Sequence, residues 1–385
     1  MQTMQPSVTL GSYTWAQDRL PLDEFTLRLE DLHAAMDRNG WKAVLAYGDV
    51  REHAALAFLS NFIPRVRWAI ALLPRSGDPR LVCAMSTRDL PAMLSLTWIA
   101  DGRSGMGPEW AKSFDPWFEQ FQSEHAVSLG TLGFDFMAPV LFQSVRNSLG
   151  KRFVLQKADD ILGLASRPKR PRELTMIRAS CKVLDAAAKT FADSWRNNHA
   201  PETAALDAER VARSLAAQDV RTLVSLDGGR TLVPYQGLFE QKAGSLVGYI
   251  AVKMAGYWAD MFVTVNDGDA GPAARHTEAA LDALIAMVQP GARSAALHAV
   301  AADALRPFAL HPILGESVGH GIGLSLQESS TFCAAEDAAL VEDGVYTLQV
   351  GTADAKSGPA LISAIVRNTR TGAEVLARSP SAATA

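Results

Sequence analysis

The stretch Glu316-Ser317-Val318-Gly319-His320-Gly321-Ile322-Gly323-Leu324 decides the fold, and it places one histidine between glycines. Flanking glycines let the backbone pass close to a neighbouring group and leave the imidazole free to point into a cavity. The alternative is a hydrogen-bonded core histidine, and the stretch alone does not choose between the two. The choice depends on the rest of the C-terminal half.

Four further motifs accompany this stretch in a defined order. A helix is expected to open at residues 172–178, and a strand at Gly256-Tyr257-Trp258-Ala259-Asp260. A second strand is expected at residues 343–348, and a closing hairpin with a Thr-x-x-Gly turn at residues 365–376. In this order the motifs resemble the pita-bread superfamily of creatinase, aminopeptidase P, prolidase and methionine aminopeptidase.

The resemblance implies an α/β (α+β) fold with a creatinase-like N-terminal domain followed by a pita-bread domain. We place the first domain at residues 1–165, the second at 166–378 and a disordered tail at 379–385. Hydrophobic spacing predicts a helix over residues 22–39, ended by Gly40, and strands over 68–74 and 81–84. The basic segment 167–172 is interpreted as a solvated linker.

Metallopeptidases of this superfamily hold two divalent ions with two aspartates, one histidine and two glutamates. The resemblance places the second aspartate on Asp260 and the histidine on His320, and both are present. The other positions fall on neutral residues, namely Tyr249 or Ile250, Gln349 and Ser363. Two divalent ions facing one carboxylate would leave buried charge uncompensated, so we expect no metal cofactor of this kind. A single ion on Asp260, His320 and Glu328 stays open as a poorer alternative.

Creatinase offers a precedent for the loss of the metals, because it keeps the fold and cleaves a C–N bond with acid–base groups. Its catalytic histidine falls within residues 226–235, which contain no histidine, and its glutamate falls on Phe262. The resemblance therefore suggests metal-independent hydrolysis without reproducing creatinase's residue set.

We expect His320 to be the general acid or base, because imidazole titrates near neutral pH. Asp260 would orient it or hold a cationic group of the substrate, and Glu328 is expected at the same strand parity. Four neutral residues are expected to bind substrate: Tyr235, Tyr249, Gln349 and Ser363. The alternatives are a structural Asp260–His320 pair, a surface carboxylate at Glu328, and tyrosines that belong to the core or rim.

Residues 58–68 resemble the family strand that reaches toward a dimer partner's active site. Arg65 and Arg67 would then project from one strand face and bind a substrate carboxylate through their planar guanidinium groups. The alternative is a pair of solvated arginines. The resemblance also implies a homodimer.

Bulk composition excludes several classes of protein. A net charge of −4 argues against a nucleic-acid partner. The three widely spaced cysteines, Cys83, Cys181 and Cys333, indicate a reducing, cytoplasmic setting. Neither an apolar signal segment nor a run of apolar residues long enough to span a membrane is recognisable.

Three functional hypotheses follow. The first is a metal-independent, creatinase-like hydrolase of a C–N bond in a small carboxylate-bearing amidine, amide or cyclic amino-acid derivative. The second is an Xaa-Pro-type metallopeptidase with altered ligands, acting on short peptides. The third is a non-catalytic pita-bread binding protein, which the loss of three ligand positions favours.

Overall fold

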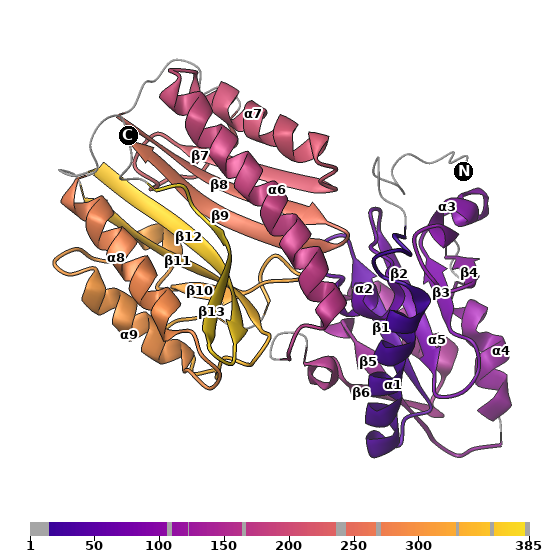
Figure 1. The fold of residues 1–385 in the computed structure, drawn as a ribbon. Helices are drawn as coiled ribbons and strands as arrows, with labels where there is room; N and C mark the ends of the chain where they lie inside the picture. Colours follow the sequence, from indigo (N-terminus) through magenta and orange to yellow (C-terminus); the bar gives the residue numbers. More distant parts are fainter. Residues whose placement is uncertain are drawn as a thin grey trace. The chain divides into compact units, whose positions relative to one another are not determined.

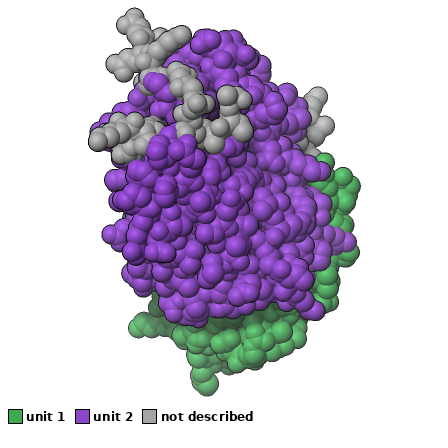
Figure 2. Space-filling view, turned by 60° about the vertical axis from the view of Figure 1, so that its left-hand side comes forward, with its two compact units in different colours: residues 1–164 green, residues 165–385 purple. Residues whose placement is uncertain are grey.

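The computed structural model describes residues 15–105, 110–121, 123–163, 167–235, 244–266, 271–328, 331–354 and 358–381. The chain divides into two compact units, Met1–Leu164 and Ala165–Ala385, which Figure 2 shows in different colours. Each unit has its own sheets, helices and apolar core, so each is described by itself.

Unit 1 is built on a mixed six-stranded sheet in the order β4-β3-β2-β1-β5-β6 (Figure 1). β1 pairs antiparallel with β2 and parallel with β5, so the sheet changes direction at its centre. The strands are β1 (Ala43–Asp49), β2 (Trp68–Pro74), β3 (Arg80–Cys83), β4 (Asp101–Ser104), β5 (Val127–Leu132) and β6 (Phe153–Lys157). The helices are α1 (Leu22–Asn39), α2 (Ala54–Ser60), α3 (Leu90–Leu94), α4 (Asp115–Phe118) and α5 (Pro139–Leu149).

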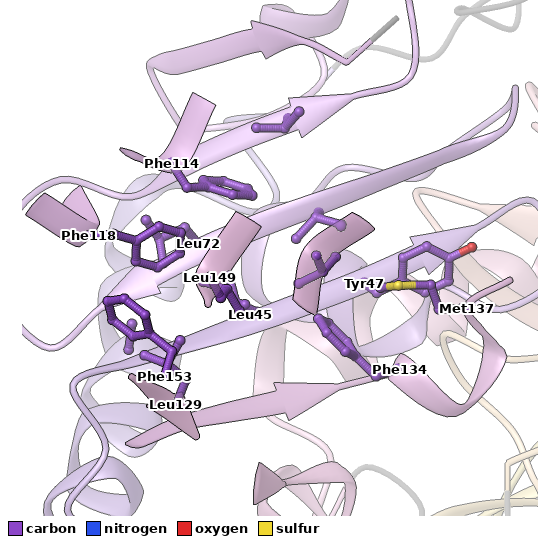
Figure 3. Close-up of a cluster of buried hydrophobic side chains, with 14 of the residues drawn as sticks. Leu45, Tyr47, Leu72, Phe114, Phe118, Leu129, Phe134, Met137, Leu149 and Phe153 are labelled. Atoms are coloured by element: carbon purple, nitrogen blue, oxygen red, sulfur yellow. The ribbon is translucent and has the colours of Figure 1, made fainter. Parts of the chain in front are cut away.

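The local predictions for unit 1 hold where the hydrophobic pattern is regular. α1 spans Leu22–Asn39 as expected, and Gly40 caps it in the left-handed conformation with φ of 68°. β2 and β3 form the expected antiparallel pair. Tyr47 of β1 belongs to a cluster of buried hydrophobic side chains that also includes Phe114 and Phe118 (Figure 3).

The described residues of unit 2 form two antiparallel sheets and four α-helices, in keeping with the α/β prediction (Figure 1). Its helices are α6 (Pro171–Arg196), α7 (Pro201–Ser214), α8 (Pro272–Met287) and α9 (Ser294–Ala304). Strands β7 (Asp219–Ser225), β8 (Ser245–Met254) and β9 (Tyr257–Asn266) form one sheet. Strands β10 (Gly319–Gly321), β11 (Val345–Asp354), β12 (Gly358–Thr369) and β13 (Gly372–Arg378) form the other.

The two sheets of unit 2 meet along β9 and β12. The backbone N–H of Leu361 donates to the hydroxyl of Thr264 at 2.8 Å, and that hydroxyl donates to the Leu361 carbonyl at 2.9 Å. α6 and α7 cover the β7–β9 sheet, and α8 packs on β11 and β12. β9 is therefore buried on both faces, except at its last residue.

Three expectations need correction. Residues 58–68 do not form one strand, because residues 58–60 end α2, residues 65–67 form a bend and β2 begins at Trp68. The basic segment 167–172 is not simply a solvated linker, because Lys169 is 5% exposed and Pro171 already begins α6. The expected tail at 379–385 begins with Ser379, which is buried and hydrogen-bonded. Residues 382–385 lie outside the described part of the chain.

Among the described residues, no helix combines the length and the apolar character needed to cross a membrane.

Candidate active site

Asp260 lies in the middle of β9 and is 1% exposed. The register pairs Asp260 with Ala251 and Phe262 with Tyr249, so these four residues share one face of the β7–β9 sheet. Ile250 projects from the opposite face and is fully buried. Of the two candidates for the first-aspartate position, Tyr249 is therefore the one that faces Asp260.

Both carboxylate oxygens of Asp260 accept hydrogen bonds from neutral hydroxyls. The Tyr249 phenol donates to Oδ2 at 3.0 Å, and the Thr347 hydroxyl, from β11 of the other sheet, donates to Oδ1 at 2.7 Å. Burial and the neighbouring carboxylate raise the pKa of Tyr249 well above its usual value, so the phenol keeps its proton. Asp260 is thus a buried carboxylate satisfied by protein donors from two sheets.

His320 occupies β10, opposite Thr347. Its Nε2 lies 3.5 Å from Oδ2 of Asp260, and its Nδ1 lies 3.1 Å from the carbonyl oxygen of Gly321. Burial disfavours the charged ring, but the Asp260 carboxylate and the Gly321 carbonyl outweigh it and raise the pKa of His320. The structure therefore favours an imidazolium that faces a carboxylate.

Gly319 of β10 and Gly323 just after it leave room for groups that pack closely against the backbone. A Cβ at Gly319 would lie 2.5 Å from the Thr347 carbonyl oxygen. A Cβ at Gly323 would lie 2.5 Å from Oε1 of Glu328. The prediction of close backbone approach is confirmed at both positions.

Glu328 lies near His320 but is held by a different partner. Its Oε2 is 2.7 Å from Nζ of Lys169, and both side chains are buried, with 7% and 4% of their surface exposed. Its backbone N–H donates to the Gly321 carbonyl, because the chain turns back after β10. The expectation that Glu328 shares a strand with His320 is therefore wrong, although its charge does help to raise the pKa of His320.

Gln349 and Ser363 face each other across β11 and β12, next to the Asp260 cluster. Ser363 has a structural partner, because its Oγ accepts the backbone N–H of Phe262 at 3.1 Å. The Ser363 N–H and carbonyl both bond to the hydroxyl of Ser379. Gln349 is half-buried, and no hydrogen bond of its side-chain amide is found among the described residues. Of the two, Gln349 has the side chain better placed to bind a ligand.

The remaining predicted contacts lie elsewhere. Burial and the carboxylate of Glu209, on α7, raise the pKa of the Tyr235 phenol. Arg65 and Arg67 belong to unit 1, in the bend before β2. The structure of unit 2 therefore brings Asp260, His320 and Tyr249 together and leaves Tyr235 outside their hydrogen-bonded cluster.

The family model described as metallopeptidase family M24 matches residues 176–370, which is 195 of the 385 residues. The chain belongs to this family. The match covers β8, β9, β10 and β11 entirely, so the whole Asp260 cluster lies inside it. M24 is a family of C–N bond hydrolases, which is the class that the sequence favours. No curated protein matches the chain.

Solved structures extend the likeness to both units. The prolidase from Pyrococcus horikoshii OT3 has a TM-score of 0.73 at 17% identity, with 93% of this chain and 100% of that chain covered. The X-Pro aminopeptidase from Thermotoga maritima MSB8 has a TM-score of 0.74 at 18% identity, with 92% and 98% covered. The N-terminal domain of the FACT complex subunit SPT16 from Cicer arietinum (chickpea) has a TM-score of 0.68 at 16% identity, with 94% and 98% covered. At these identities the likeness concerns the fold, and it confirms the pita-bread resemblance.

The donor set of this M24 protein does not suit the family's dinuclear metal centre. Oδ2 of Asp260 already accepts from Tyr249 and faces His320, while Oδ1 accepts from Thr347. Across the part of the chain that the structure describes, no group of three or more His, Cys, Asp or Glu side chains is arranged to hold a metal ion. Two divalent ions need several anionic ligands, whereas this cluster offers one carboxylate.

Three residues of this region were not singled out from the sequence. Thr347 lies within the recognised strand motif, so its position opposite His320 could have indicated its role. Lys169 pairs with Glu328 across 159 positions of sequence, which no local pattern reveals. Arg221 of β7 pairs with Ala251 of β8, which in turn pairs with Asp260 of β9, and only the strand register shows this.

Proposed function

We propose that this M24 protein is a metal-independent hydrolase of a C–N bond in a small carboxylate-bearing amidine, amide or cyclic amino-acid derivative. The observation that carries the proposal is the contact between His320 Nε2 and Asp260 Oδ2, at 3.5 Å, in a cluster where neutral residues occupy the family's other three ligand positions. Family membership supports the hydrolase class. The neutral Tyr249, Gln349 and Ser363 support independence from metal.

His320 is the proposed acid–base group. Its Nε2 contact with Asp260 is long for a hydrogen bond, as catalytic contacts often are before substrate binds. In hydrolysis the C–N bond breaks, and the leaving nitrogen takes the proton from Nε2. Water forms the new C–O bond and gives its proton to the imidazole, which restores the charged ring. Asp260 stabilises the imidazolium before the proton leaves and again once water has restored it.

Tyr249 and Gln349 are the proposed neutral contacts with substrate. Tyr249 is half-buried, and its hydroxyl is already oriented by Asp260. Gln349 lies in the same region on β11. Glu328, Tyr235, Ser363, Arg65 and Arg67 stay predictions, as do the cytoplasmic location and the homodimer through which the two arginines would reach a partner's site.

A second function is favoured by one observation. Both ring nitrogens of His320 already face internal acceptors, and Glu328 is paired with Lys169, so the cluster is also satisfied without substrate. A non-catalytic binding protein with this fold would keep such a cluster for stability. The likeness to a FACT complex subunit is compatible with that role.

Turnover of dipeptides and small amidines, measured with and without EDTA, separates these functions. We expect EDTA-resistant turnover that His320→Asn abolishes and that the matched control His298→Asn, on α9, retains. EDTA-sensitive peptidase activity would replace the proposal with the metallopeptidase alternative. A folded wild-type protein without turnover on any of these compounds would favour the binding protein.

A further inference from the structure

Arg221 lies in the same row of the sheet as Asp260. β7 pairs Arg221 with Ala251, and β8 pairs Ala251 with Asp260, so the three residues cross the sheet side by side on one face. Along β7, Val220 and Thr222 are buried on the opposite face, whereas Arg221 is exposed. Only the methyl group of Ala251 stands between Arg221 and Asp260 in this row.

The guanidinium of Arg221 extends across β8 toward β9. Its Cζ lies 4.5 Å from the centre of the Trp258 ring. Trp258 precedes Asp260 by two residues on β9 and therefore shares its face of the sheet. The positive charge of Arg221 also acts on the Tyr249 phenol. It lowers the pKa of that phenol, against the larger effects of burial and Asp260, which raise it.

Arg221 retains donors for a ligand. Within the described part of the chain its charged partner is Asp219, at 3.7 Å between Nη2 and Oδ2, which is longer than a hydrogen bond. Its side chain is 54% exposed. Stacking on Trp258 holds the guanidinium plane in place without using its N–H groups.

We propose that Arg221 anchors the carboxylate of the substrate beside the Asp260–His320 pair, an inference that rests on the proposed function. A charged His320 balances Asp260, and Arg221 adds an exposed guanidinium beside that pair, with Asp219 as its carboxylate neighbour at 3.7 Å. A guanidinium binds a carboxylate through two parallel hydrogen bonds, which fixes both position and orientation. The substrate is then a compact molecule whose carboxylate lies on the β7 side and whose C–N bond lies at His320.

Binding of carboxylate and carboxamide forms of the same compounds tests the anchor. The probes are alanyl-proline and guanidinoacetate, each with its carboxamide, titrated by calorimetry into wild type, Arg221→Met, Arg221→Lys and the surface control Arg210→Met. We expect wild type to prefer each carboxylate by at least about tenfold. Arg221→Met should remove the preference, Arg221→Lys should keep part of it, and Arg210→Met should leave it unchanged.

His320→Asn separates this inference from the proposed function. The variant should lose turnover and still prefer the carboxylate, because the anchor does not depend on proton transfer. Retained turnover in His320→Asn would overturn the proposed function alone. Equal binding of carboxylate and carboxamide by wild type, an undiminished preference in Arg221→Met, or no binding of either carboxylate at millimolar concentration would overturn the anchor.

Discussion

Asp260 and Glu328 are two buried carboxylates of unit 2, and both act on the charge of His320. Asp260 accepts from two neutral hydroxyls and faces an imidazole, which is a group that can take up and release a proton near neutral pH. Glu328 is instead bound to the ammonium group of Lys169 at 2.7 Å. We therefore propose that Asp260 takes part in the chemistry, whereas the ion pair of Glu328 with Lys169 stabilises the fold.

Removing Lys169 from its ion pair with Glu328 should have the largest effect on stability. Lys169→Met leaves Glu328 buried without its ammonium partner, and we expect a loss of about 3–5 kcal/mol in the free energy of unfolding. Urea denaturation measures it. The double variant Lys169→Met/Glu328→Gln should recover most of the loss, because it removes both charges. A single-variant loss below about 1 kcal/mol, as for a surface ion pair, would contradict the proposed stabilisation of the fold.

The two hydroxyls that donate to Asp260, from Thr347 and Tyr249, should differ in their contribution to the free energy of unfolding. Thr347→Val removes a fully buried donor and should cost about 1–3 kcal/mol. Tyr249→Phe should cost less, about 1 kcal/mol, because water can reach the half-buried position and the ring still packs on Phe262 at 5.1 Å. Chemical denaturation of both variants measures the difference, and a larger loss for Tyr249→Phe would reverse the order.

The Asp260–His320 pair should make stability depend on pH. The folded-state pKa of His320 is raised above its usual value of 6.5, so the folded state binds this proton more tightly than the unfolded chain does. The resulting stabilisation is complete below the unfolded pKa and is lost as the pH rises through the folded one. Unfolding curves between about pH 6 and 9 should show this fall in wild type, and His320→Asn should lack that component. An identical pH dependence in both proteins would contradict the charged pair.

Asp185, on α6, is a third carboxylate of unit 2 to compare with Asp260 and Glu328. Its side chain is exposed to solvent along one side, but partial desolvation of the carboxylate raises its pKa to about 6, offset in part by the backbone N–H of Arg378. Its ionised form is therefore disfavoured in the folded state, and the cost appears as the pH rises from about 4 to 6. Asp185→Asn should stabilise the protein by about 1 kcal/mol at neutral pH, after allowance for solvent screening, and by nothing in acid. Equal effects at both pH values would argue for a cause other than ionisation.

The parts of the fold that were predictable have local signals. α1 has regular apolar spacing and a capping glycine, and β9 and β10 have motifs of recognisable order. Asp260 and His320 followed from those motifs, and Tyr249 was one of two candidates separated by a single residue. Only the pairing of β8 with β9 chose between them, because neighbouring residues of a strand point to opposite faces.

The parts that were not predictable depend on contacts distant in sequence. Lys169 looked like one of several linker cations until α6 and the segment after β10 brought it to Glu328. Ser363 occupies a ligand position, yet its hydroxyl accepts the Phe262 N–H. Arg65 and Arg67 were expected on a strand, but the apolar run before them forms α2. In each case the residue type was clear and its partner was not.

Metal stoichiometry tests the central claim most directly, namely that this M24 protein has exchanged its metal ligands for a hydrogen-bonded Asp260 cluster. Protein equilibrated with zinc, manganese or cobalt, passed through a desalting column and analysed by mass spectrometry gives the number of ions per chain. We predict well under one ion per chain for wild type, and the same value for Asp260→Asn, because Asp260 is not a ligand. Two ions per wild-type chain that are lost in Asp260→Asn would contradict the account.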